Sequence, residues 1–116
     1  MSTADLIFYP TNHQPTRLIQ LDCDQCLRFL MPYIQSCRES GRIASAVAEI
    51  QFSDGSVVWF GSGEGSIDVH RERPRFGRSR RLLGIFPAPM QRHSQQQVDD
   101  DTVQQFICYV YDSVAA

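Results

Sequence analysis

The four cysteines are the residues of this sequence with the most readily recognised chemistry. Cys23 and Cys26 form a CxxC pair, whereas Cys37 and Cys108 stand apart from it. A CxxC pair at the start of a helix is typical of a thiol-disulfide redox site, because the helix terminus lowers the pKa of the first thiol. Thiolates are also the preferred ligands of structural zinc. The cysteines therefore raise two hypotheses, redox chemistry and metal binding.

The redox hypothesis rests on the CxxC pair and its surroundings. From Leu18 to Cys37, a strand is followed by CxxC and by a helix that contains a proline, and this layout resembles a thioredoxin-like redox site. Asp24 and Gln25, between the two cysteines, are not the residue types common there, and an acid beside a thiol raises its pKa. All three cysteines of this stretch share a helical apolar stripe, which favours core packing. A thiol-disulfide function using Cys23 and Cys26 stays as an alternative.

Metal binding and catalysis have weaker signals. Structural zinc usually takes two closely spaced pairs of ligands, and this chain has one such pair. His70 and His93 are the remaining candidate ligands, and nothing in the sequence fixes their distance from the thiols. There is no GxSxG or HExxH motif, and the absence of Lys excludes a Schiff-base lysine or a P-loop lysine. We predict no metal, no cofactor and no catalytic residue.

An Arg-rich segment, residues 71–81, is the most unusual stretch of the chain. Counted over residues 70–92, seven Arg and one Glu give a charge of +6. The net charge of the chain is −2, so the other residues together carry −8. Pro74 and Gly77 disfavour a helix, and we expect a loop or an irregular strand. The residues predicted to bind a partner are Arg71, Arg73, Arg75, Phe76, Arg78, Arg80 and Arg81.

The Arg-rich segment admits two functions and one structural explanation. Planar guanidinium groups make paired hydrogen bonds to carboxylates and phosphates, so an acidic protein partner is the favoured interpretation. Nucleic acid is the alternative, with Phe76 able to stack on a base. The structural explanation is a solvated loop whose charges pair with the acids of the domain itself.

Composition sets the class of protein. The chain has 116 residues, which predicts one domain over residues 1–116, and all 11 basic residues are Arg. The net charge of −2 does not indicate an anionic membrane or nucleic acid as a general partner. No apolar run is long enough to span a bilayer and the N-terminus does not resemble a signal peptide, so we expect no membrane partner and a cytoplasmic location. The oligomeric state is left open.

The first half of the chain predicts two strands and a helix. Leu6–Tyr9 is a short apolar run stopped by Pro10, which predicts an edge strand. Residues 17–21 alternate in polarity and predict a second strand. Asp22 is the expected N-cap of a helix that Gly41 ends, and Pro32 is expected to kink or restart it.

The second half predicts a hairpin, further strands and a C-terminal helix. Asp54-Gly55 between the runs 43–52 and 56–60 is a strong hairpin signal, and a Gly-rich loop, Gly61–Gly65, is expected to follow. Strands are predicted at 66–70 and 82–86. A helix is predicted after Asp99, Asp100 and Asp101, with an apolar stripe of Val103, Phe106, Ile107, Val110, Tyr111 and Val114.

These elements predict an α+β fold, with an antiparallel sheet of four or five strands and two amphipathic helices packed on one face. The function predicted is a small non-enzymatic interaction protein of inhibitor, immunity or adaptor type. It is expected to bind an acidic macromolecular partner through the Arg-rich segment.

Overall fold

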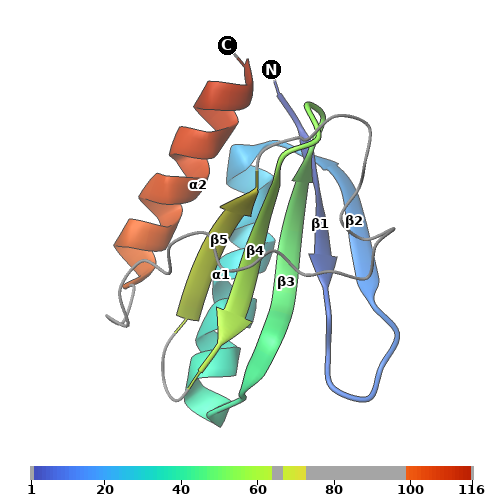
Figure 1. The fold of residues 1–116 in the computed structure, drawn as a ribbon, viewed down its shortest axis with the longest axis vertical. Coiled ribbons are helices and arrows are strands. Elements are labelled where there is room, and N and C mark those ends of the chain that lie inside the picture. Colours follow the sequence, from blue (N-terminus) through green and yellow to red (C-terminus); the bar gives the residue numbers. More distant parts are fainter. Residues whose placement is uncertain (1, 64–66, 73–98, 116) are drawn as a thin grey trace.

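A computed structural model of the protein describes residues 2–63, 67–72 and 99–115 (Figure 1). These residues form five strands and two helices, which confirms the predicted α+β fold. In chain order the elements are β1 (Ala4–Phe8), β2 (Thr16–Leu21), α1 (Cys23–Ser40), β3 (Ala44–Phe52), β4 (Val57–Ser62), β5 (Ile67–Glu72) and α2 (Asp100–Ala115).

The strands form one antiparallel sheet in the order β2-β1-β3-β4-β5. The prediction that the first strand lies at an edge is wrong, because β1 pairs with β2 on one side and with β3 on the other. Pro10 does not interrupt this pairing, since it lies beyond the strand, and the backbone N–H of Tyr9 still donates to the carbonyl of Val47 at 2.9 Å. The borders of the described sheet are β2 and β5.

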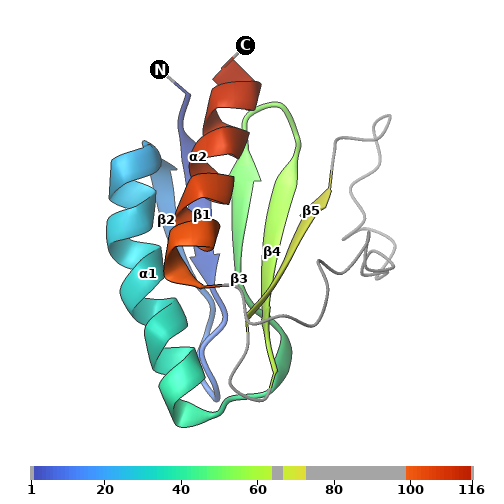
Figure 2. The ribbon, with the colours of Figure 1, turned by 90° about the vertical axis from the view of Figure 1, so that its left-hand side faces the viewer.

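Both helices lie against the same face of the sheet (Figure 2). Each helix buries one stripe of side chains, which joins the side chains of alternate strand positions in a single apolar cluster. The helix residues buried there are Cys26, Leu30, Ile34 and Cys37 of α1 and Val103, Ile107, Val110 and Tyr111 of α2. The apolar core therefore lies between the two helices and one face of the sheet.

The sequence around α1 explains where the helix begins and ends. Asp22 accepts a hydrogen bond from the backbone N–H of Gln25, whose side chain in turn accepts from the N–H of Asp22, and this is a capping box. Gly41 ends the helix in the left-handed region at φ 66°. Pro32 lies inside the helix, which continues through it as one element rather than restarting.

The predicted hairpin between β3 and β4 is confirmed. Gly55 has φ 89°, and the backbone N–H of Ser56 donates to the Asp54 carboxylate at 2.8 Å. The expected Gly-rich loop starts too early, because Gly61 and Ser62 belong to β4. Gly61 serves close strand packing instead, since a Cβ at this position would lie 2.9 Å from the carbonyl oxygen of Ser45.

The C-terminal helix also follows its prediction. Asp99 accepts a hydrogen bond from the backbone N–H of Thr102 at 2.8 Å, and Asp100 pairs with Arg38 of α1. The acidic residues thus cap one helix and connect it to the other. The strand predicted at 82–86 lies outside the described residues.

Candidate functional site

One row of side chains crosses the face of the sheet opposite α1 and α2, which we call the far face. Strand register pairs Arg17 with Ile7, Ile7 with Glu49, Glu49 with Trp59, and Trp59 with His70. Directly opposed residues of antiparallel strands project from the same face, so this row passes through all five described strands. Ile7, Glu49 and Trp59 at its centre are buried, with exposed fractions of 4%, 0% and 8%.

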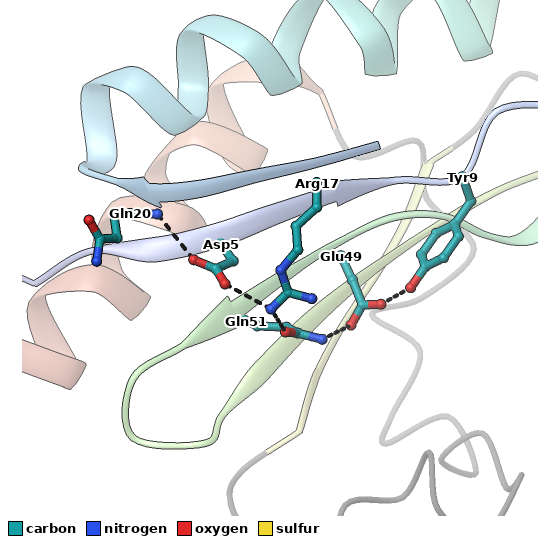
Figure 3. Close-up of polar contacts among 6 residues, drawn as sticks. All are labelled: Asp5, Tyr9, Arg17, Gln20, Glu49 and Gln51. Carbon is teal, nitrogen blue, oxygen red and sulfur yellow. Dashed lines mark hydrogen bonds and ion pairs between the residues drawn. The ribbon is translucent and has the colours of Figure 1, made fainter. Parts of the chain in front are cut away.

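Glu49 is unusual in this row because its side chain is acidic and yet fully buried. The hydroxyl of Tyr9 donates to one carboxyl oxygen, and the side-chain amide of Gln51 donates to the other at 3.2 Å (Figure 3). Burial raises the pKa of Glu49 to about 7, although the hydrogen bond from Gln51 acts in the opposite direction. Glu49 is therefore a buried carboxyl group that changes protonation near neutral pH.

Arg17 connects Gln51 to the first two strands. Its guanidinium group donates to the Gln51 amide oxygen and to the Asp5 carboxylate, both at 2.8 Å (Figure 3). The other Asp5 oxygen accepts from the backbone N–H of Gln20 at 3.0 Å, where the chain has a positive φ of 55°. The pKa of Asp5 is lowered by this backbone hydrogen bond and by Arg17, against the effect of partial burial.

The contacts form a continuous chain from Gln20 through Asp5, Arg17, Gln51 and Glu49 to Tyr9. The chain joins β2, β1 and β3, so it holds together strands that are distant in the sequence. A carboxyl group with a pKa near 7 has the proton affinity of a general acid or base. Glu49 is fully buried, however, so it contacts no substrate in this conformation, and what it offers is a proton-dependent connection between strands.

The buried network around Glu49 is not among the features predicted from the sequence. The sequence signal that could indicate the network is the presence of Glu49 and Gln51 at alternate positions in β3. Except for Ser45, the other residues of this strand are apolar. A charged side chain in the middle of a long apolar strand has to be hydrogen-bonded if it is buried. The partners Tyr9 and Arg17 come from other strands, and the local pattern does not identify them.

The predicted Arg-rich contact surface lies mostly outside the described residues. Arg71 belongs to β5, and its guanidinium group donates to the Ser113 hydroxyl of α2 at 2.9 Å, so its side chain lies on the helix-covered face. The predicted contact residues outside the described chain are Arg73, Arg75, Phe76, Arg78, Arg80 and Arg81.

The contacts of the cysteines differ from those that the CxxC hypothesis predicts. Cys23 begins α1, but its Sγ atom lies 3.3 Å from that of Cys108 in α2. The CxxC hypothesis predicts that the helix terminus lowers the pKa of Cys23. Burial and the neighbouring Cys108 instead raise this pKa to about 12. Burial also raises the pKa of Cys26 to about 11. These thiols are protonated at neutral pH, which disfavours a role as redox nucleophiles.

Residues 2–63, 67–72 and 99–115 contain neither a cluster of metal-binding side chains nor a helix that could cross a membrane. Within this part of the chain, no three His, Cys, Asp or Glu side chains gather in a way that would hold a metal ion. Neither α1 nor α2 has the length and apolar character needed to cross a membrane. His93, a candidate ligand in the zinc hypothesis, lies outside the described residues.

Comparison with known proteins gives no relative from which a role could be transferred. No protein-family model matches the chain, and no curated protein or solved structure matches it either.

Proposed function

We propose that this protein is a non-enzymatic interaction domain of inhibitor, immunity or adaptor type, which binds an acidic macromolecular partner through the Arg-rich segment 71–81. The observation that carries the proposal is the separation of charge along the chain. Residues 70–92 hold seven Arg and one Glu, or +6, whereas the other residues hold four Arg and 12 acidic residues, or −8. A cationic segment of this density attracts anionic surfaces and orients their approach.

The position of β5 supports this proposal. Among the described strands, β5 lies at one end of the sheet order, and Arg71 and Glu72 are its last two residues, so the Arg-rich segment begins at a border of the described sheet. Guanidinium groups are weakly hydrated and form paired hydrogen bonds, which suits them to carboxylates on a protein surface.

The two alternatives are supported to different degrees. Nucleic acid would use the same guanidinium groups for phosphates and Phe76 for stacking, so it competes directly with an acidic protein. A thiol-disulfide function is less favoured, because the raised pKa values of Cys23 and Cys26 leave little thiolate at neutral pH.

A binding experiment with a charge-matched control tests the proposal. The wild-type protein and a variant with Arg73→Ala, Arg75→Ala and Arg78→Ala are used for affinity capture, and Kd is then measured for each purified partner. We expect the triple variant to bind its partner at least ~10-fold more weakly, because each lost charge pair costs a substantial part of a kcal/mol or more. The matched pair is Arg75→Ala against Arg28→Ala, which removes one exposed positive charge from α1.

The alternatives give different results in a parallel measurement. Labelled single- and double-stranded nucleic acids are titrated at 50 and 200 mM salt, concentrations chosen because phosphate contacts lose affinity steeply across about this range. Nucleic acid binding that collapses with salt and with the triple variant would make the nucleic acid alternative the leading one. A partner whose Kd is unchanged in the triple variant would contradict the role of the Arg-rich segment under either alternative.

A further inference from the structure

Two thiols from distant parts of the sequence meet between the helices. Cys23 is the first residue of α1 and Cys108 lies within α2, 85 positions away, and their Sγ atoms are 3.3 Å apart. Both side chains are partly exposed, and neither is in a disulfide. The contact is independent of the Arg-rich segment and of the proposed function.

We propose that Cys23 and Cys108 are a modification site, where oxidation by a small disulfide such as oxidised glutathione forms a reversible covalent link between α1 and α2. A disulfide bond is about 2.05 Å long, so the two sulfur atoms have to approach by roughly 1.3 Å, which rotation of two partly exposed side chains can supply. Cys26 and Cys37 are buried, with exposed fractions of 0% and 4%, and they are less accessible to the oxidant.

The chemistry is a pair of thiol-disulfide exchanges. One protein thiolate attacks oxidised glutathione, which forms a mixed disulfide and releases one reduced glutathione. The second protein thiol, already in contact with the first, displaces the second glutathione and closes the bond. In total the protein loses two hydrogen atoms, and one oxidised glutathione becomes two reduced molecules. The raised pKa of Cys23 slows attack by its thiolate near neutral pH but does not set the final equilibrium.

The link would enclose most of the fold. The segment between Cys23 and Cys108 contains β3, β4 and β5, so the disulfide would restrict a large part of the unfolded chain. Because a cross-link over such a long loop destabilises the unfolded state strongly, we expect Tm to rise by roughly 10 °C on oxidation. The link would make stability respond to the thiol-disulfide balance of the surroundings.

Peptide mapping of the 116-residue chain identifies the bond. The chain is equilibrated in mixtures of reduced and oxidised glutathione, alkylated, and digested with trypsin, which cleaves this lysine-free chain only after Arg. Cys23 and Cys26 then share peptide 18–28, Cys37 lies in peptide 29–38, and Cys108 lies in peptide 93–116. We expect the oxidised protein to lose two hydrogen atoms and to give peptide 18–28 linked to peptide 93–116.

Cysteine variants assign the bond and its effect. Cys26→Ala should retain the link between the two peptides, whereas Cys23→Ser and Cys108→Ser should lose both the link and the dependence of Tm on reductant. Cys37→Ser is the control that keeps both, and it also serves if Cys26→Ala does not fold. A link that survives in Cys23→Ser, a link from peptide 18–28 to peptide 29–38, or a monomer that keeps all its thiols in excess oxidised glutathione would overturn the proposal.

Discussion

The two faces of the sheet bury their side chains in different ways. Against the helices, Leu6, Ile50 and Phe60 belong to a continuous apolar cluster and are fully buried. On the far face, Ile7 and Trp59 are also buried, but Glu49 lies between them in the strand register and is buried with them. The two faces are therefore both buried, but they are stabilised by different kinds of interaction.

The difference is one of directionality. Apolar contacts between the helices and the sheet depend on area and fit and change little with pH. The contacts of Glu49 depend on the placement of Tyr9 and Gln51 and on the proton that the carboxyl group carries. The first face should determine most of the stability, and the second face should determine how stability responds to pH.

The largest loss of stability is expected from the helix-covered face. Among the described residues, Phe60 has the largest fully buried side chain. Phe60→Ala should lower the free energy of unfolding by about 3–5 kcal/mol, through lost burial and the cavity left behind. Chemical denaturation at pH 7 measures the loss. Ile19→Ala is the control, since Ile19 is 63% exposed and its truncation should change stability by about 0.5 kcal/mol or less.

The far face should determine the pH dependence. The pKa of Glu49 is raised from 4.5 to about 7 in the folded state, so its favourable contribution is complete below about pH 4.5 and is lost as pH rises through about 7. Relative to Glu49→Gln, which cannot titrate, the wild type should lose about 2–3 kcal/mol of unfolding free energy between about pH 5 and 8. Urea denaturation of both proteins across this range measures the difference.

The same comparison of Glu49→Gln with the wild type can also contradict the raised pKa of Glu49. Glu49→Gln should be more stable than the wild type at pH 8, because the variant does not bury a charge. Parallel pH profiles for the two proteins would mean that Glu49 stays ionised in the folded state, and the far face would then be no more sensitive to pH than the helix-covered face.

The smallest effect is expected at the exposed end of the polar chain. Arg17→Ala removes the hydrogen bonds to Asp5 and Gln51, but the Arg17 side chain is 50% exposed, so the loss should be about 0.5–1 kcal/mol. Thermal unfolding at low and high salt measures the loss, which should shrink as salt screens the ion pair. Arg28→Ala is the matched control, and an equal loss in both variants would remove any special role for Arg17.

Local signals in the sequence predicted the elements on the helix-covered face. The Asp22 cap, the apolar stripes of both helices and the Asp54-Gly55 turn each act within a few residues, and the structure confirms them. The overestimated Gly-rich loop has a local cause as well. Glycine at position 61 is counted as the start of that loop, whereas the structure uses its missing side chain for close approach to Ser45.

The far face and the thiol contact could not be predicted in the same way. Three features depend on tertiary pairing: the position of β1 inside the sheet, the contact between Tyr9 and Glu49, and the contact between Cys23 and Cys108. Residues 40 or 85 positions apart leave no periodic trace in a single sequence. The CxxC spacing identifies two cysteines that are close in the sequence, whereas the thiol in contact with Cys23 belongs to the other helix.

The pairing of β1 with β3 also has a consequence for the order of folding. The β3–β4 turn is short, and hairpins of this kind form within microseconds, whereas β1 pairs with β3 across an intervening strand and helix, and contacts between such distant segments form more slowly. Glu49 therefore gains its hydrogen bond from Tyr9 only when these two distant parts of the chain have met. Glu49 is the one fully buried carboxyl group among the described residues, and burying it costs more free energy when it is ionised. We therefore expect folding to slow as pH rises and Glu49 loses its proton.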